Sequence, residues 1–419
     1  MFDLTTLLKN AKTASLNISS LTEKQVNKAL LDCANAIRTS AQFLIEQNKL
    51  DLANAREKNM TDAFIDRRTL NNSVIESIAC GIEQVAKLKS PRNKVCYRYK
   101  NRRQKIDVKK IYVPFGVIGI IFESRPNVTA DAFALCFKTA NAVVLRGGSD
   151  AINSNKAIVE ILRNTLSKNG IDKNAVSLIE DTSREVATEF MKRSDYVDLL
   201  IPRGGASLID SVKENSSIPI IETGKGNCHI YVDKYADIDK AVKIIYNAKT
   251  QRYSVCNACE SLVIHTDILG EVLPLIAESL REKQVEIACD ERAEKEIKDY
   301  PYLVRATEED FYAEYGKAKI SVKTVDNISL AIEHINKCST KHSEAIITEC
   351  PNARDTFFNL IDSSCVYHNA STRFSDGFVF GLGAEIGIST QKLHARGPMG
   401  LNGLVTTKYI INGNGAVRK

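Results

Sequence analysis

Cys256 of this 419-residue chain has a sequence environment that suits a catalytic nucleophile. Cys256 follows an amphipathic segment over 238–248 and a short polar stretch, and a β-branched apolar run begins at Leu262. A turn between two regular elements presents a side chain instead of packing it, and Arg252 offers positive charge that favours a thiolate. This placement suits a nucleophile, although most intracellular cysteines are small buried hydrophobic residues.

The spacing of Cys256 and Cys259 also fits other chemistry. A C-x-x-C pair occurs in redox sites and as one half of zinc sites. A structural zinc site needs a second pair of ligands with suitable spacing, and Cys228-His229 does not supply one. We favour a nucleophilic Cys256 over a redox pair or a zinc site, because isolated C-x-x-C pairs are common by chance in a chain with 11 cysteines.

Composition limits the class of protein. With 44% hydrophobic and 26% charged residues, the chain has ordinary globular composition and is long enough for two or three domains. An odd number of cysteines without regular spacing favours a reducing compartment. The N-terminus lacks a secretory leader pattern and no apolar run reaches about 18 residues, so we expect a cytoplasmic protein without a membrane span. The net charge of +6 favours anionic ligands only weakly.

Helices and strands must position these residues. The first ninety residues have helical spacing, with a capping box at Thr22 and Gln25, and β-α alternation follows. Helices are expected around 26–37, 43–56, 74–88, 130–139, 155–167, 184–192, 208–213, 273–281, 330–337 and 353–361. Strands are expected at 113–123, 142–145, 176–179, 197–201, 218–221, 262–265, 285–288, 320–325, 345–348 and 366–369. Apolar strands separated by helices predict an α/β fold with helix-covered parallel sheets.

Glycine-rich and polar segments follow several of the expected strands. Such sheets bind ligands at the carboxyl ends of their strands, so these segments predict a nucleotide site. No Gly-x-Gly-x-x-Gly fingerprint opens a helix, and an ordinary dinucleotide turn is therefore not expected. We predict as cofactor contacts Arg146, Gly147, Gly148, Arg203, Gly204, Gly205, Glu222 and Glu385.

A basic segment over 94–110 carries eight lysines and arginines against Asp107 alone, with Tyr97 and Tyr99 between them. It could bind nucleic acid, because basic and aromatic residues contact phosphates and bases. No recognition module accompanies it, and we therefore favour an exposed β-hairpin that pairs with another subunit.

Motifs in the right order resemble the γ-glutamyl phosphate reductases (glutamate-5-semialdehyde dehydrogenases) of proline biosynthesis, in the aldehyde dehydrogenase superfamily. They include Val113-Pro-Phe-Gly, Ser-Arg-Pro-Asn127-Val-Thr, Ser254-Val-Cys-Asn-Ala and the glycine-rich run from Gly381 to Gly400. The resemblance extends from near residue 20 to about 415. It implies a Rossmann-type NADP-binding domain (1–94 and 113–228) and an α/β catalytic domain (229–395). A small oligomerisation piece (95–112 and 396–419) would join the hairpin to a C-terminal strand.

The resemblance also implies the roles of residues. Cys256 would attack L-glutamyl 5-phosphate and form a thioester, which NADPH would reduce to L-glutamate 5-semialdehyde. Asn127 and the Cys256 backbone N–H would stabilise the oxyanion. Arg252 would contact the substrate. Apart from the resemblance, Asn369, Ser371, Thr372 and Arg373 follow an expected strand, and we expect them to hold the substrate α-carboxylate, because arginine binds carboxylates through two N–H donors.

Some details separate this chain from related enzymes. Tyr253 and Val379 replace an expected proline and an expected acidic residue. Arg146 follows its strand with no acid before Asp150, which favours NADPH over NADH. We expect a homo-oligomer, association with glutamate 5-kinase and no nucleic-acid partner.

An aldehyde dehydrogenase that releases a free acid is the second hypothesis, and a basic nucleic-acid-binding protein on an inherited fold is the third. In the acid-releasing enzymes a glutamate at the position of Glu222 activates water. A reductase gains nothing from such a base, so here we expect Glu222 to contact turn amides or the cofactor.

Overall fold

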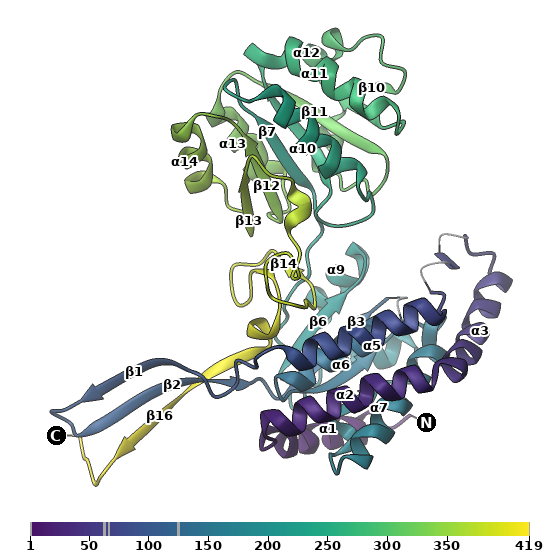
Figure 1. Ribbon diagram of the computed structural model, residues 1–419, viewed down its shortest axis with the longest axis vertical. Coiled ribbons are helices and arrows are strands. Elements are labelled where there is room, and N and C mark those ends of the chain that lie inside the picture. Colours follow the sequence, from purple (N-terminus) through teal and green to yellow (C-terminus); the bar gives the residue numbers. More distant parts are fainter. Residues whose placement is uncertain (1, 62–63, 66–67, 124–125, 419) are drawn as a thin grey trace. The chain divides into compact units, whose positions relative to one another are not determined.

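The computed structural model describes residues 2–61, 64–65, 68–123 and 126–418, which divide into two compact units (Figure 1). Unit 1 comprises Met1–Glu222, Leu382–Gly387 and Met399–Lys419, and unit 2 comprises Thr223–Gly381 and Ile388–Pro398. The boundary expected at 228/229 differs from this division, because strand β7 (Cys228–Val232) begins at Cys228 and pairs inside unit 2. Ser124 and Arg125 of the predicted Ser-Arg-Pro-Asn motif lie outside the described residues.

Amphipathic helices begin unit 1. In α2 the apolar positions Val26, Leu30 and Ile37 are buried, which confirms the expected helical spacing. The Thr22 N–H donates to Gln25 Oε1 (2.9 Å) and the Gln25 N–H donates to Thr22 Oγ1 (3.3 Å), so the capping box is confirmed. The helices are α1 (Leu4–Ser19), α2 (Glu23–Thr39), α3 (Ala41–Glu57) and α5 (Asn72–Lys87).

A four-stranded parallel sheet with strand order β5-β4-β3-β6 forms the centre of unit 1. Its strands are β3 (Val117–Phe122), β4 (Ala142–Arg146), β5 (Val176–Leu178) and β6 (Leu199–Arg203). The connecting helices are α6 (Asn127–Lys138), η1 (Ser149–Ala151), α7 (Ile152–Lys168), η2 (Lys173–Ala175), α8 (Arg184–Met191) and α9 (Ala206–Asn215). Register brings Arg146 opposite Ile121 and Arg203 opposite Phe122, so the polar segments after β3, β4 and β6 share one sheet edge.

The prediction of a single strand over 113–123 was wrong, because β2 ends at Pro114 and β3 begins at Val117. Gly116 interrupts it at φ +128°, a backbone conformation that favours glycine, and a Cβ there would lie 2.3 Å from Asp198 Oδ2. Asp198 accepts the Val117 N–H at 2.8 Å and so fixes the start of β3. The strand expected at 218–221 is reduced to an isolated bridge between Leu200 and Ile220.

The basic segment forms a β-hairpin, as expected. Strands β1 (Val95–Asn101), β2 (Ile106–Pro114) and β16 (Val405–Gly413) make an antiparallel sheet in the order β1-β2-β16. Figure 1 shows these three strands side by side, extending away from the helices of unit 1. The sheet therefore joins the hairpin to the C-terminal strand, and we call it the arm.

A seven-stranded parallel sheet forms unit 2, with strand order β10-β9-β11-β8-β7-β12-β13. Besides β7, its strands are β8 (Cys259–His265), β9 (Glu286–Cys289), β10 (Leu303–Arg305), β11 (Lys319–Val325), β12 (Ser343–Ile347) and β13 (Cys365–His368). Its helices are α10 (Ile238–Thr250), α11 (Thr266–Arg281), α12 (Glu291–Glu296), η3 (Glu308–Tyr312), α13 (Ile328–Cys338), α14 (Pro351–Leu360) and η4 (Thr372–Phe374). Strands β14 (Ile388–Ser389) and β15 (Gly397–Pro398) form a separate antiparallel pair.

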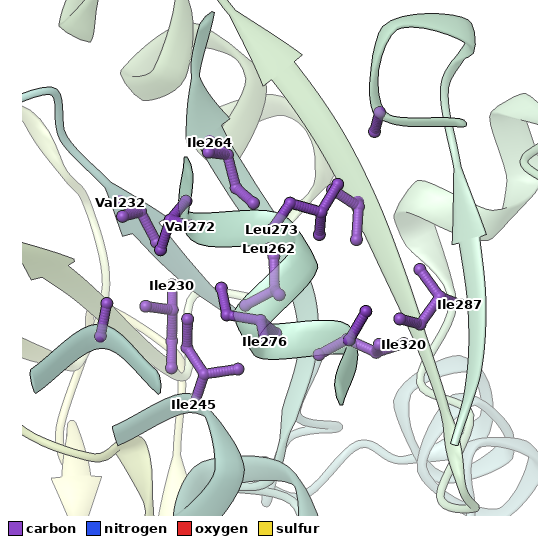
Figure 2. Close-up of a cluster of buried hydrophobic side chains, with 14 of the residues drawn as sticks. Ile230, Val232, Ile245, Leu262, Ile264, Val272, Leu273, Ile276, Ile287 and Ile320 are labelled. Carbon is purple, nitrogen blue, oxygen red and sulfur yellow. The ribbon is translucent and has the colours of Figure 1, made fainter. Parts of the chain in front are cut away.

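Apolar side chains on both sides of the Cys256 turn anchor it to this sheet. Ile245 of α10 packs with Ile230 of β7, Leu262 of β8 and Ile276 of α11 in one buried cluster (Figure 2). Close packing of this kind fixes the elements that enter and leave the turn. In the described part of the chain, no helix combines the length and apolar character needed to cross a membrane.

Candidate active site

Cys256 lies in the turn between α10 and β8, as the sequence predicted. Its side chain is half-buried, whereas Cys228 and Cys259 are fully buried. Burial raises the pKa of the Cys228 and Cys259 thiols well above the ordinary value, which keeps them protonated and unreactive. Among these three neighbouring cysteines, exposure therefore favours Cys256 as the nucleophile.

The backbone of Cys256 is held by the segment that precedes β7. A Cβ on Gly226 would lie 1.3 Å from the Cys256 carbonyl oxygen, so only glycine allows this approach. The Cys228 thiol donates to the same carbonyl at 3.2 Å. Gly224 is also close-packed, because a Cβ there would meet Thr390 at 2.6 Å. Of the two glycines in the Glu222–Asn227 motif, Gly226 therefore packs against the Cys256 turn and Gly224 packs against Thr390.

The segment after β13 is tied to the residue that follows Cys256. Thr372 Oγ1 donates to the Asn257 carbonyl (2.8 Å), and Asn257 Nδ2 donates to the carbonyls of Ser375 (2.9 Å) and Arg373 (3.3 Å). Asn257 and Thr372 are buried, so these bonds are shielded from water. We call residues 371–375 the clamp loop.

Arg373 of the clamp loop lies beside the nucleophile. Its Nε donates to Gln251 Oε1 at 2.8 Å, at the end of α10. Burial lowers the pKa of its guanidinium, the nearby Cys256 sulfur opposes that shift, and Arg252 adds to it. Two predicted substrate residues, Arg252 and Arg373, are therefore close to each other, and Arg373 is close to Cys256.

The other predicted substrate residues have structural contacts. Asn369 Oδ1 accepts the Thr348 N–H (3.0 Å), and its Nδ2 donates to the Thr348 carbonyl (3.1 Å). Ser371 Oγ accepts the Arg373 N–H at 3.3 Å, and the Thr372 hydroxyl donates to the Asn257 carbonyl. Asn369, Ser371 and Thr372 shape the strand end and the clamp loop, and their contact with substrate stays a prediction.

A buried ion pair braces the elements on either side of the turn. Lys249 Nζ lies 2.6 Å from Glu260 Oε2, and both side chains are fully buried. Burial raises the pKa of Glu260 to about 7, although Lys249 and the Gly316 N–H oppose the rise. Lys249 is in the last turn of α10 and Glu260 is in β8, so the pair joins the two ends of the Cys256 turn.

The histidines of unit 2 differ in burial: His229, His265 and His342 are buried, His334 and His368 are half-buried, and His394 is exposed. Burial lowers the pKa of His342 to about 4, so its ring is neutral at pH 7. Its Nδ1 lies 2.8 Å from Ser343 Oγ and 3.8 Å from Cys228 Sγ, behind the Cys256 carbonyl. Among the described residues, no group of three or more His, Cys, Asp or Glu side chains is arranged to hold a metal ion.

Asn127, the predicted oxyanion donor, begins α6 in unit 1. Its Nδ2 donates to Asp131 Oδ2 at 3.2 Å, one turn along the helix. Burial raises the pKa of Asp131 to about 6, although Asn127 and Arg203 partly oppose the rise. An amide group carries two N–H donors, so Asn127 could give its second Nδ2 hydrogen to an oxyanion, and that role stays a prediction.

Arg146 and Gly147 lie at the carboxyl edge of the unit 1 sheet. Arg146 Nη2 donates to the carbonyls of Thr182 (2.6 Å) and Ser183 (3.2 Å), while its buried Nε has no hydrogen-bond acceptor in the described part of the chain. A Cβ on Gly147 would lie 2.4 Å from Asn155 Nδ2. Gly147 is therefore needed for close packing, and Gly148 precedes the short helix η1.

Arg203, Gly204 and Gly205 follow β6 at the same edge. The Arg203 carbonyl accepts the Glu123 N–H (3.0 Å), and Glu123 Oε2 accepts the Gly205 N–H (3.0 Å). A Cβ on Gly204 would lie 2.6 Å from Glu123 Cδ. Glu123 thus shapes this glycine turn, and the cofactor contacts of its residues stay predictions.

Glu222 and Glu385 both belong to unit 1. Glu222 Oε2 lies 3.1 Å from Lys213 Nζ of α9, and its side chain is 31% exposed. Glu385 is half-buried, two residues after Gly383, which has φ +71°. Their predicted contacts with the cofactor remain predictions.

Sequence reasoning missed several residues that shape the site. It did not single out Gly226, Gln251, Ser375 or Asp131, and it gave Cys228 no role beside Cys256. The spacing of Asn127 and Asp131, one helical turn apart, was a usable signal. Nothing in the sequence signals the approach of Gly226 to Cys256, because 30 residues separate them.

Comparison with known proteins gives concordant results. The model of the aldehyde dehydrogenase family matches residues 3–295. The chain is 53% identical to a γ-glutamyl phosphate reductase of Lachnospira eligens, with 98% of each chain covered. It is 50% identical to the enzyme of that name from Listeria monocytogenes, with 99% of this chain and all of the relative covered. A crystal structure of γ-glutamyl phosphate reductase from Thermotoga maritima, 43% identical, matches the whole of both chains with a TM-score of 0.97.

Proposed function

Because the chain belongs to the γ-glutamyl phosphate reductases, oxidoreductases within the aldehyde dehydrogenase family, we propose that it reduces L-glutamyl 5-phosphate to L-glutamate 5-semialdehyde and phosphate through a thioester on Cys256. The observation that supports this most is the half-buried Cys256, held in a braced turn beside Arg373. An anionic acyl phosphate suits a thiol flanked by guanidinium groups. The product serves proline biosynthesis.

Cys256 carries the covalent step. Its thiolate attacks the γ-carbonyl carbon, the carbon–sulfur bond forms, and phosphate leaves with the electron pair of the broken carbon–oxygen bond. After reduction of the thioester carbon, the carbon–sulfur bond breaks and releases the aldehyde and the thiolate. The proton consumed in the overall reaction ends on the departing phosphate.

Two donors would stabilise the oxyanion that forms during attack. Asn127 Nδ2 supplies one N–H, and its bond to Asp131 fixes the direction of the amide. The Cys256 backbone N–H supplies the other, and the contacts of Gly226 and Cys228 with the carbonyl of the same residue restrain the backbone of Cys256. Donors fixed before reaction lower the barrier because they need no reorganisation.

A nicotinamide cofactor supplies the hydride when bound, and we propose NADPH for this chain. Among the described residues the buried Nε of Arg146 has no acceptor, which fits such a group, since a ribose or phosphate oxygen would provide one. Arg203 and the glycines after β6 extend the same edge. The guanidinium of Arg146 favours the 2′-phosphate, although the carboxylate of Asp181 is close enough to interact with it electrostatically.

Release of a free acid is disfavoured by the setting of Glu222. The carboxylate lies 3.1 Å from Lys213 Nζ, so an ion pair already engages it. A water-activating base would also destroy the thioester before its reduction.

The arm suits self-association, and we propose a homo-oligomer. Tyr97, Tyr99, Tyr409 and Ile411 of its strands are each more than half exposed in the chain alone. Association with glutamate 5-kinase and a cytoplasmic location stay predictions.

The reverse reaction tests the proposed function. Purified protein is supplied with L-glutamate 5-semialdehyde, phosphate and NADP⁺, and formation of NADPH is followed. We expect NADPH formation to require phosphate and to be lost in Cys256→Ala. Equal rates without phosphate, with glutamate as product, would show that the chain is an acid-releasing aldehyde dehydrogenase.

A further inference from the structure

We propose that Arg373, assisted by Arg252, binds the phosphate group of the substrate and not its α-carboxylate. This inference rests on the proposed function and reverses the sequence-based expectation that the clamp loop holds the α-carboxylate. It gives the phosphate specificity of the reaction mainly to Arg373, with Arg252 in a supporting role.

The clamp loop keeps Arg373 at a fixed distance from Cys256. Asn257, the residue after the nucleophile, donates to the carbonyls of Arg373 and Ser375 and accepts from Thr372. Ser375 Oγ in turn lies 2.6 Å from Tyr367 Oη of β13. The backbone of Arg373 is thus fixed to the catalytic turn by buried bonds, and its side chain cannot move away with the loop.

The side chain of Arg373 is oriented as well. Gln251 accepts its Nε–H at 2.8 Å, so one edge of the guanidinium is held by the C-terminus of α10. The Nη groups form the remaining edge, and in the described part of the chain they have no carboxylate within ion-pair distance. A guanidinium edge with two parallel N–H donors matches two phosphate oxygens.

Charges near Arg373 favour an anion there. Arg252 is exposed on the Cys256 turn and adds a second positive charge close to Arg373. Asp376 is the nearby acid, and its Oδ1 accepts the N–H groups of Phe378 (2.8 Å) and Val379 (3.2 Å). The Asp376 carboxylate therefore binds backbone N–H groups of the following residues. The guanidinium groups of Arg252 and Arg373 keep the surroundings of Cys256 positive.

The covalent structure of the substrate decides between its two anionic groups. The phosphorus atom is joined to the reacting carbon through one bridging oxygen, whereas the α-carboxylate lies beyond three further carbons. A guanidinium close to the attacking sulfur therefore meets the phosphate first. Contact with the leaving group also stabilises the charge that grows on phosphate as the carbon–oxygen bond breaks.

The reverse reaction separates the two assignments, because phosphate and semialdehyde are then different substrates. For Arg373→Gln we expect the KM for phosphate to rise at least about tenfold, a loss of about 1.4 kcal/mol, and the KM for semialdehyde to change less than about threefold. Arg373→Lys, which keeps charge without the two-donor edge, should have an intermediate KM for phosphate. Arg354→Gln is the control, since Arg354 is paired with its exposed neighbour Asp355.

A binding measurement covers the case in which turnover of the variants is too slow to measure. Inorganic phosphate should slow the alkylation of Cys256 by iodoacetamide in the wild type, and Arg373→Gln should need at least about tenfold more phosphate for the same protection. A raised KM for semialdehyde with an unchanged KM for phosphate, equal changes in both, or unaltered phosphate protection would each overturn the assignment. Absence of phosphate-dependent NADPH formation in the wild type would instead reject the proposed function.

Discussion

A β-carbon on Gly226 would lie 1.3 Å from the carbonyl oxygen of Cys256. The two residues are 30 positions apart in sequence and belong to different turns of unit 2. The carbonyl is also 3.2 Å from the Cys228 thiol that donates to it. The peptide that carries the nucleophile is therefore positioned by backbone contact with a second turn.

Gly226→Ala tests this relationship. The added methyl group must displace the Cys256 backbone, and a shift of about 1 Å in a reacting group costs about a hundredfold in rate. We expect reductase kcat to fall by about that factor while far-ultraviolet circular dichroism is unchanged. Gly270→Ala in α11 is the control, because its β-carbon would meet only the movable end of Glu296 at 3.0 Å. Near-normal kcat in Gly226→Ala would contradict the proposed constraint.

Cys256→Ala and Cys259→Ala separate the two cysteines of the C-x-x-C pair. We expect Cys256→Ala to lower turnover more than about a thousandfold, because it removes the nucleophile, and Cys259→Ala to keep most of it. Cys259 is buried in β8 and its thiol has a raised pKa, so it packs and does not react.

Alkylation by iodoacetamide provides an independent check on the same cysteines. Cys96 in the arm is exposed and will react as well, so the experiment uses a Cys96→Ser background with peptide mapping. We expect Cys256 to be labelled first and substrate to protect it. Preferential labelling of Cys259, or an active Cys256→Ala enzyme, would refute the assignment.

Glu222→Gln should lower reductase kcat by less than about tenfold, or 1.4 kcal/mol. The reaction needs no activated water, and the carboxylate is paired with Lys213. Oxidation of NADPH and release of free glutamate are measured side by side, with Cys256→Ala as the inactive reference. A loss beyond about a hundredfold in a folded variant would place the carboxylate in the chemistry.

Asp131→Asn should change how stability depends on pH. The pKa of Asp131 in the folded protein is about 6, raised from 3.8 by burial, so its ionisation opposes folding. Its stabilising contribution is full below about pH 4 and is lost as the pH rises to about 6, on the order of 3 kcal/mol in total. Relative to wild type, Asp131→Asn should therefore gain stability between pH 4 and 6.5 in urea unfolding.

The control for this measurement is Asp210→Asn in α9, an exposed aspartate of the same unit. The Asp210→Asn variant should unfold at nearly the same urea concentration as the wild type, because exposed substitutions change stability little. A constant difference between Asp131→Asn and wild type across the range would show that Asp131 does not titrate in this interval.

Arg146→Ala should reduce the preference for NADPH. We expect the wild-type ratio of kcat/KM for NADPH over NADH to exceed about ten and to fall several-fold in the variant, because the arginine accommodates a 2′-phosphate. The ratio is the informative quantity, since loss of the bonds to Thr182 and Ser183 lowers activity with both cofactors. Equal kcat/KM values in the wild type would contradict the prediction.

The sequence alone determined the α/β class, the capping box at Thr22 and the position of Cys256 between a helix and a strand. These features depend on local periodicity and on short-range turn chemistry, which are written in neighbouring residues. The basic hairpin was also predictable, because charged and aromatic residues alternate along it. Motif order was enough to indicate the family.

The tertiary structure decided what surrounds the nucleophile. Gly226, Asn257 and Arg373 reach the Cys256 turn from separate loops, and contacts over such sequence separations leave no periodic signal. Gly116 is a second example, because the strand is interrupted there by a contact with Asp198, which precedes the neighbouring strand β6. Long-range packing selects these residues, because a backbone approach or a buried hydrogen bond has meaning only once the chain is folded.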